Sequence, residues 1–117
     1  MSGAESSPPV LLQKNLFNAL ASLTSNEESC RKRLVDKKKF IDELLSGIKS
    51  KHPQIKYAAC NCFVSLSRSD RMIKSMILEA GDFTKELVSI LLGNDVDESL
   101  ELIVCKAICN LALDVQK

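Results

Sequence analysis

Apolar residues recur at spacings of three and four between Pro53 and Arg68, which is typical of one face of an α-helix. The apolar positions of this stretch are Ile55, Ala58, Ala59, Cys62, Phe63 and Leu66. Polar side chains occupy the opposite face. Proline suits the first turn of a helix, where its missing N–H leaves no hydrogen bond unmade. The pattern therefore predicts an amphipathic helix that begins at Pro53.

The same helical pattern occurs three times along the chain. A shift of 43 residues back places it on a helix predicted from Val10 to Ser25, and a shift of 45 residues forward places it on one from Asp97 to Leu113. The residues that align with Ile55, Ala59, Cys62, Phe63 and Leu66 are Leu12, Leu16, Ala19, Leu20 and Leu23 in the first copy, and Leu100, Val104, Ala107, Ile108 and Leu111 in the last. A helical period of roughly 40 to 47 residues is typical of armadillo and HEAT solenoids.

Two shorter predicted helices precede the second and third copies, and their apolar positions repeat at the same offset of 43 residues. At the helix ends, Ser25 and Glu28 match a capping box. Gly81 suits a helix stop with positive φ, and Asp82 suits the following N-cap. A short, a medium and a long helix per unit is the armadillo arrangement, whereas HEAT units have two helices.

We therefore predict an all-α fold, an armadillo-type right-handed α-solenoid. It consists of two full three-helix repeats at 26–69 and 70–117, preceded by the last helix of a partial repeat at 10–25. Residues 1–9 are small and polar, and we expect them to form a disordered lead-in.

Composition narrows the function classes. The formal net charge of the 117-residue chain is +1, from 16 basic and 15 acidic side chains, which does not suit a dedicated nucleic-acid binder. The longest nearly apolar run, Leu87–Leu92, is far shorter than a membrane span of roughly 20 residues. Residues 1–9 do not form a secretory signal. Five cysteines, an odd number, favour a reduced intracellular setting over a disulfide framework. We therefore expect neither nucleic-acid nor membrane partners.

The cysteines and the basic run are the remaining candidate chemistry. Cys60, Cys62, Cys105 and Cys109 align with small or apolar positions of the other copies, so packing is the favoured interpretation over metal binding. With one histidine in the chain, a structural zinc site lacks ligands, and we expect no metal, no cofactor and no catalysis. The one run of basic residues is Arg31, Lys32, Arg33, Lys37, Lys38 and Lys39. Interleaved acidic residues favour a solvated face there over a nuclear-localisation or acidic-partner patch.

The polar stripes of the three long helices point to a peptide-binding groove. In an armadillo stack the third helices line the concave surface, so equivalent positions form rows. The rows are Asn18, Asn61 and Lys106; Ser22, Ser65 and Asn110; Lys14, Tyr57 and Leu102; and Ser25, Arg68 and Leu113. Amide side chains both donate to and accept from an unpaired peptide backbone. We predict partner binding by Asn18, Ser22, Tyr57, Asn61, Ser65, Arg68, Lys106 and Asn110. Asn and Ser are also ordinary solvated residues on an exposed helix, so the alternative of no binding role stays open.

Several motifs in order resemble one particular family. Glu79-Ala80-Gly81 and Ala107-Ile108-Cys109-Asn110-Leu111 match the general armadillo pattern. Leu20-Ala21-Ser22-Leu23, Asn26-Glu27-Glu28 with Arg31-Lys32-Arg33, Ala58-Ala59 with Cys62, Ser65-Leu66-Ser67-Arg68-Ser69 and Cys109-Asn110-Leu111 resemble a mid-to-late segment of the armadillo repeat-containing protein 8 family. That resemblance covers about Gln13 to Leu113 and implies a non-catalytic subunit of the GID/CTLH ubiquitin ligase complex, in cytoplasm and nucleus. It implies ubiquitin-ligase subunits as partners. Members of that family are much longer, so the chain resembles a fragment or a short isoform.

Two other classes of function were compared with the ligase scaffold. A cargo adaptor of the nuclear-transport kind is the alternative, but only Asn110 matches the asparagine of those proteins, and Asn18, Asn61 and Lys106 stand where they carry Trp. A metal- or thiol-dependent enzyme is the third hypothesis. Because the predicted fold leaves apolar surface open at both ends, we also expect the isolated chain to self-associate or to be marginally stable.

Overall fold

The computed structural model describes residues 8–25, 27–68, 71–93 and 96–112. Within these ranges the chain is all-helical, with seven helices and no strand. The helices are α1 (Pro8–Ser25), α2 (Glu28–Val35), α3 (Lys38–Lys49), α4 (Pro53–Ser67), α5 (Arg71–Ala80), α6 (Phe83–Leu92) and α7 (Glu98–Ala112). The prediction of an all-α chain is therefore confirmed.

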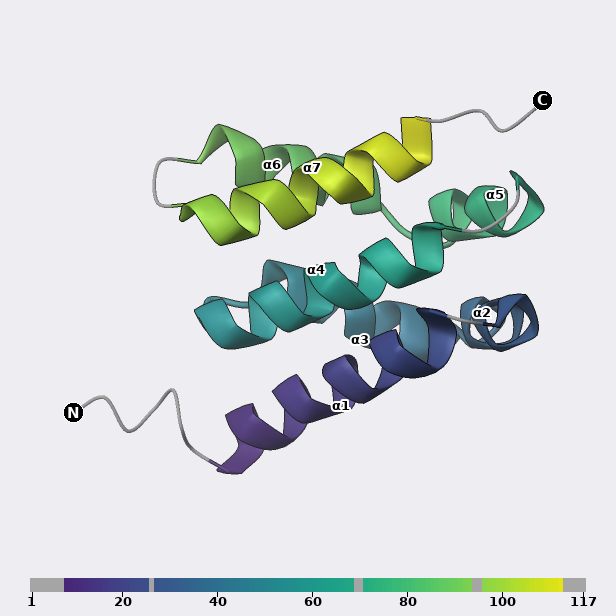
Figure 1. The fold of residues 1–117 in the computed structure, drawn as a ribbon, viewed down its shortest axis with the longest axis horizontal. Helices are drawn as coiled ribbons and strands as arrows, with labels where there is room; N and C mark the ends of the chain where they lie inside the picture. The colour runs from purple at the N-terminus through teal and green to yellow at the C-terminus, as the bar shows by residue number, and fades with distance from the viewer. Residues whose placement is uncertain (1–7, 26, 69–70, 94–95, 113–117) are drawn as a thin grey trace.

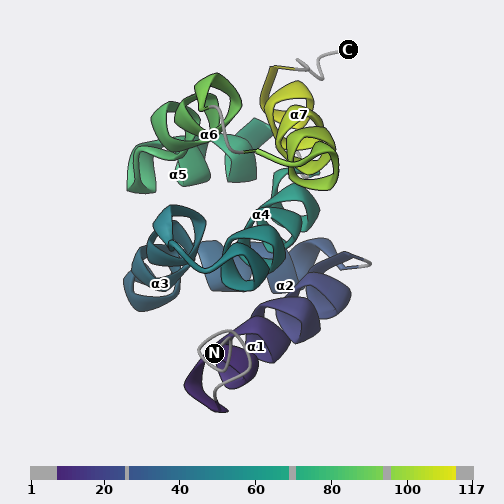
Figure 2. The same cartoon turned by 90° about the vertical axis from the view of Figure 1, so that its left-hand side faces the viewer.

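The three longest helices, α1, α4 and α7, form a row in which α4 packs against both of the others (Figure 1). Figure 2 shows α3, α5 and α6 on one side of that row. The shorter helices also stack on one another, α2 against α5 and α3 against α6. The molecule measures 50 × 28 × 21 Å, and its longest axis runs roughly parallel to the long helices, across the direction in which they stack (Figure 1).

The central helix α4 carries the densest part of the core. All six apolar positions of the pattern that begins at Pro53 are buried, and Pro53 itself occupies the first turn of α4, as predicted. The ring of Phe63 stacks on that of Phe83 from α6, with centroids 4.8 Å apart. Because α4 contacts helices on several sides, it fixes the positions of α1 and α7 in the row.

A close approach of three helices occurs at Gly47 of α3. A Cβ atom at this position would lie 2.7 Å from the ring of Phe17 on α1 and 2.9 Å from the Cβ of Ala59 on α4. Side chains do not normally come so close, so only glycine fits without a shift of the neighbours. The missing side chain lets α3 lie against α1 and α4 together.

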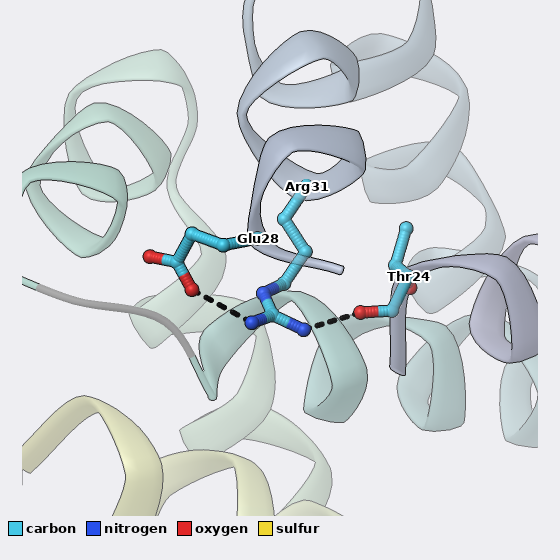
Figure 3. Close-up of polar contacts among 3 residues, drawn as sticks. All are labelled: Thr24, Glu28 and Arg31. Atoms are coloured by element: carbon cyan, nitrogen blue, oxygen red, sulfur yellow. Dashed lines mark hydrogen bonds and ion pairs between the residues drawn. The ribbon is translucent and has the colours of Figure 1, made fainter. Parts of the chain in front are cut away.

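The corner between α1 and α2 is held by a buried cation (Figure 3). Arg31 donates hydrogen bonds from Nη1 to the carbonyl oxygen of Thr24 and from Nη2 to Oε1 of Glu28, the latter at 2.7 Å. The solvated-face interpretation of the basic run is therefore wrong for Arg31, because the end of α1 offers it a carbonyl partner. Lys74 stands 43 residues further on and is also buried.

Three predicted helix ends differ in detail. Ser25 is the last residue of α1 and donates to the Ser22 carbonyl oxygen at 2.9 Å, and the N-cap of α2 is Glu27, so the predicted capping box is wrong. Asp82 is the N-cap of α6, but with ψ of 54° its side chain makes no capping hydrogen bond. Gly81 does not have a positive φ. Its small size matters instead, because a Cβ there would lie 3.2 Å from the Phe83 ring.

The outer boundaries lie close to those expected. Helix α1 begins at Pro8, two residues before the predicted Val10. Asp97 caps the start of α7, because its Oδ1 accepts a hydrogen bond from the Leu100 N–H at 2.8 Å. Helix α7 ends at Ala112. The rest of the predicted lead-in, residues 1–7, and the predicted last residue of the long helix, Leu113, lie outside the described residues.

Equivalent apolar positions are buried in α4 but exposed in α1. Leu12, Leu16 and Leu23 are 72%, 54% and 61% exposed, whereas the aligned Ile55, Ala59 and Leu66 are exposed by 3% or less. We call Leu12, Leu16 and Leu23 the α1 ridge. In α4 these positions are covered by the helices that precede and follow it in the chain, and in α1 no described helix covers them.

The opposite end of the row is also apolar and open in the described part of the chain. Val35 of α2 is buried against the rest of the molecule at 5% exposure, whereas the aligned Leu78 of α5 is 44% exposed. Cys60 is fully buried, whereas Cys105, its equivalent on α7, is exposed. The faces of α5, α6 and α7 that continue the stacking direction are thus left partly apolar.

Candidate protein-binding surface

The polar row predicted to bind a partner comes from three helices that lie side by side. Asn18 of α1 and Lys106 of α7 are exposed, and Asn61 of the central α4 is half-buried. Since the three positions are equivalent on adjacent, stacked helices, their side chains can contact one extended segment that crosses α1, α4 and α7.

A pocket of about 410 Å³ opens between α1 and α4 at one end of this row. Its lining residues are Lys14, Asn18, Pro53, Gln54, Tyr57, Ala58 and Asp97. The structure therefore brings Asn18 together with Tyr57, whose side chain is 40% exposed. The pocket has two amides and a phenol in its wall, a cation on α1 and a carboxylate before α7. This combination suits a peptide backbone with polar side chains.

The serine and asparagine row is arranged differently. Ser22 of α1 is exposed, but Ser65 of α4 is buried at 8% exposure. The Asn110 side chain donates to the Val64 carbonyl oxygen at 3.3 Å and to Ser67 Oγ at 3.2 Å, so it joins α7 to α4. Ser65 and Asn110 thus contribute to packing between the long helices. The residues of the predicted groove that a partner can reach are therefore the more exposed ones.

The remaining predicted positions lie along the edges of the row. Arg68, the C-cap of α4, is exposed, and so is Leu102 of α7. Binding by any of the predicted residues stays a prediction. Sequence reasoning missed Gln54 and Asp97 as pocket residues, although Gln54 lies one helical turn before Ala58 and Asp97 comes directly before α7.

The cysteines fall into two groups. Cys60 and Cys62 are buried, which confirms the packing interpretation, and burial raises the pKa of each thiol to about 12. For Cys60 the nearby Lys56 cation opposes this rise in pKa. Cys105 and Cys109 are exposed, so the packing prediction is wrong for them, because no described helix covers that face of α7.

The described residues contain no group of three or more His, Cys, Asp or Glu side chains arranged to hold a metal ion. None of their helices combines the length and the apolarity that crossing a membrane requires. His52, the one histidine of the sequence, is the half-buried N-cap residue of α4, and its backbone N–H donates to Ser50 Oγ at 3.1 Å.

Comparison with known proteins finds related chains over most of the sequence. Over 103 residues, 88% of this chain, it is 32% identical to GID complex subunit 5 of Schizosaccharomyces pombe. Over the same length it is 32% identical to armadillo repeat-containing protein 8 of Danio rerio and 29% identical to that of Pongo abelii. The chain is a homologue of part of these proteins. This confirms the resemblance found in the sequence motifs.

The match is partial on the relatives' side. The chain spans 12% of the length of the S. pombe protein and 15% of the length of the D. rerio protein. No protein-family model and no solved structure matches the chain. The homology therefore relates this helical array to a short portion of long armadillo-repeat proteins.

Proposed function

We propose that this chain is a non-catalytic protein-protein interaction scaffold that acts in a GID/CTLH-type ubiquitin ligase complex. The observation that carries the proposal is the homology over 88% of the chain to a protein named as a GID complex subunit and to proteins named for armadillo repeats. Its role is to link substrate-recruiting and scaffold subunits in the cytoplasm and nucleus.

The helical arrangement supports an armadillo-type right-handed solenoid as the framework of that scaffold. The described helices form the triplets α2–α4 and α5–α7, each ending in a long helix that joins the row begun by α1. We assign these triplets as two whole repeats and α1 as the last helix of a preceding one. Stacked units of this kind present one continuous surface built from equivalent positions.

The partner contact that we propose is an extended peptide laid across α1, α4 and α7. Asn18 and Asn61 supply amides for its backbone, and Tyr57 supplies an aromatic wall in the pocket of about 410 Å³. Lys14 and Asp97 border the same pocket with opposite charges, which favours one direction of the peptide over the other. The exposure of Asn18 and Tyr57 leaves both side chains accessible to a partner.

Affinity purification of the tagged chain from its native cells, followed by mass spectrometry, tests the proposal. We expect RING-containing and LisH-CTLH-containing ligase subunits to be recovered. A double substitution of Asn18→Ala and Tyr57→Ala should lower their recovery, and Lys85→Ala, at an exposed position of α6, should not. Recovery of importin-β-type carriers without ligase subunits would contradict the scaffold and favour the cargo-adaptor alternative. Recovery of no ligase subunit at all would contradict assembly by this chain.

A further inference from the structure

The pocket of about 410 Å³ between α1 and α4 lies inside the array, not at one of its ends. Helix α3 packs against α4, and α1 and α7 flank it, yet Tyr57 on α4 remains 40% exposed. Lys14 stands at the equivalent position of α1, 43 residues earlier. The pocket therefore belongs to the outward face of the long helices, which a stacked array keeps open. We call this hollow the α1–α4 pocket.

The polar side chains of the α1–α4 pocket are not engaged with one another. In the described part of the chain, the side chains of Lys14, Asn18, Gln54 and Tyr57 form no hydrogen bond or ion pair. Asp97 uses Oδ1 to accept from the Leu100 N–H, which fixes the carboxylate and leaves Oδ2 for another donor. Two amides, a phenol, a cation and a carboxylate oxygen can thus bind a ligand without first breaking contacts within the protein.

A comparison with the next hollow along the array makes the unpaired charges stand out. The hollow of about 480 Å³ that α3, α4, α6 and α7 surround also has both signs of charge in its lining, but there Lys49 Nζ lies 4.0 Å from Glu86 Oε2. In the α1–α4 pocket, Lys14 and Asp97 do not form an ion pair with each other. Opposite charges that share a pocket without pairing suit a ligand that carries both signs.

The order of the helices separates these two charges. Lys14 belongs to α1, Asp97 directly precedes α7, and α4 with Tyr57 lies between the two helices (Figure 1). A cation beside Asp97 can therefore stack on the Tyr57 ring, whereas a carboxylate on the α1 side meets Lys14. Arginine suits the cation position better than lysine, because its planar guanidinium can stack on the ring while it donates to Asp97 Oδ2.

Neighbouring charges do not favour one sign over the other. Helices α1 and α4 contain no Asp or Glu, and their second lysine, Lys56, donates to the Ile48 carbonyl oxygen at 2.7 Å. Lys51 before α4 and Glu98 at the start of α7 are both exposed, and their charges offset each other. The pocket is therefore better matched to one acidic and one basic group together than to either sign alone.

We propose that the α1–α4 pocket selects an extended peptide in which an acidic residue and an arginine stand two positions apart. Side chains at i and i+2 of an extended chain project from the same face, about 7 Å apart, so both can enter one pocket. The carboxylate faces Lys14, and the guanidinium lies against Tyr57 and Asp97. This inference rests on the proposed peptide contact across α1, α4 and α7, and it adds the class of sequence that the contact accepts.

The test is a titration of the isotope-labelled 117-residue chain with synthetic octapeptides, followed by amide chemical shifts. The acid–base peptide carries Asp and Arg two positions apart among Ser and Gln, and the neutral peptide carries Asn and Gln at those two positions. We expect the largest shifts around Asn18 and Tyr57, and about fivefold tighter binding of the acid–base peptide, because each partly exposed charge pair contributes a few-fold in affinity.

The possible outcomes separate this inference from the peptide contact on which it rests. If both peptides shift the same amides with equal affinity, the charge selection is overturned while the peptide contact stands. Tighter binding of a peptide with two Asp or two Arg residues also overturns the selection. If none of the peptides shifts amides of α1 and α4, the peptide contact fails and this inference fails with it.

Single substitutions assign each charge. Lys14→Gln should weaken binding of the acid–base peptide by about threefold, and should not affect a peptide with Asn in place of Asp. Asp97→Asn keeps an oxygen for the Leu100 N–H, and should weaken only the peptides that carry Arg. Lys85→Gln, at an exposed position of α6, is the matched control and should leave every affinity unchanged. Equal weakening of all peptides by Lys14→Gln would overturn its contact with the carboxylate.

The order of the two charged residues should set the direction of the bound peptide, because amide side chains accept either backbone polarity. A nitroxide label at the amino terminus of the peptide tests this. With Asp before Arg, the label should broaden amide signals of α1 more than those of α7, and with Arg before Asp it should do the reverse. The same broadening pattern for both orders would overturn the placement of the charges.

Discussion

At the scale of single residues, buried thiols occupy the middle of the core. Cys60 and Cys62 are both on α4, and each is fully buried. Burial disfavours the thiolate because the charged form loses its hydration, and it raises the pKa of both groups to about 12. In the unfolded chain a cysteine thiol has a pKa of about 8.5. Their protonation is therefore linked to folding.

The linkage predicts a loss of stability at alkaline pH. Below a pH of about 8.5 each thiol is protonated in both the folded and the unfolded chain. Above that pH the unfolded chain releases the thiol proton, whereas the folded chain retains it until the pH reaches the raised pKa of about 12. At pH 10 each thiol should lower the free energy of unfolding by about 1 to 2 kcal/mol. Urea denaturation in reducing buffer at pH 7 and at pH 10 measures this loss.

The control for the alkaline effect is the double variant Cys60→Ala, Cys62→Ala. Lysine and tyrosine side chains also titrate near pH 10, so the comparison must be between variant and parent. The variant should lose about 2 to 4 kcal/mol less than the parent between the two pH values. Equal losses would show that the thiols do not resist deprotonation in the folded chain.

Arg31 is the residue whose role was least visible in the sequence. The adjacent Lys32 and Arg33 are exposed, and the sequence alone does not show which of these three basic residues is buried. The difference arises from helical geometry, because position 31 faces the end of α1. There the Thr24 carbonyl oxygen lacks the backbone N–H that a further helical turn would supply, and it accepts a hydrogen bond from Arg31 instead. A basic side chain that reaches such a carbonyl also interacts favourably with the helix dipole.

Arg31→Ala should therefore destabilise the chain by about 2 kcal/mol, since it removes a charge-assisted hydrogen bond and buried side-chain packing. Arg33→Ala is the matched control on the same helix and should stay within about 0.5 kcal/mol of the parent, because Arg33 is exposed. Chemical denaturation gives both values. If the free energy of unfolding changed by the same small amount in both variants, Arg31 would not stabilise the corner between α1 and α2.

At the scale of helices, the apolar period was sufficient to predict the seven helices of the described residues and the offsets between them. It did not predict the rotation of one helix against the next. Ser65 lies on the polar stripe of an isolated α4, yet it is buried because neighbouring long helices flank α4 on both sides. Asn110 similarly bonds across to α4. The helices that line the groove could thus be predicted from the sequence. The residues that remain exposed in the groove could not, because their exposure depends on contacts between helices.

The close approach at Gly47 gives a prediction for helix packing. Gly47→Ala should destabilise the chain by about 1 to 3 kcal/mol, because the added methyl group overlaps the Phe17 ring and the Ala59 side chain. The better helix propensity of alanine offsets about 1 kcal/mol of a larger gross cost. Thermal or urea unfolding followed by circular dichroism measures the difference.

Gly93→Ala provides the comparison for that substitution. Gly93 ends α6 with φ of −75°, and the nearest atom to an added Cβ lies 3.4 Å away. Alanine adopts this backbone conformation without strain, so the change in stability should be within about 0.5 kcal/mol. If Gly47→Ala were as mild as Gly93→Ala, then α3, α1 and α4 would have room to separate.

At the scale of the whole molecule, the two ends of the array differ in character. The α1 ridge is one helix wide, and basic side chains lie around the adjoining corner. The opposite end presents apolar side chains from α5, α6 and α7 together. The exposed apolar residues of this end are Leu78, Val88, Leu92, Cys105 and Cys109. Two copies of the first end can bring together only narrow apolar stripes, whereas two copies of the second bring together wider apolar faces.

We therefore expect the isolated chain to self-associate weakly through the α5–α7 end. Sedimentation equilibrium between roughly 10 and 500 μM, the range of weak contacts, should show an average mass that rises above the 12.9 kDa of one chain. Leu92 of α6 is 79% exposed. The equivalent residue of α3, Lys49, has its Nζ 4.0 Å from Glu86 Oε2 on α6, the helix stacked next to α3. By the same geometry, position 92 faces the open end of the array.

Leu78→Lys with Leu92→Lys should keep the chain monomeric, because both substitutions place charge in the apolar face. Leu16→Glu is the control at the other end and should leave the association unchanged. In the parent, association also couples stability to concentration, so its melting temperature should rise with concentration and that of the double variant should not. A parent chain that stays monomeric at the highest concentration, with a constant melting temperature, would mean that the exposed leucines at this end are too dispersed to hold two copies together.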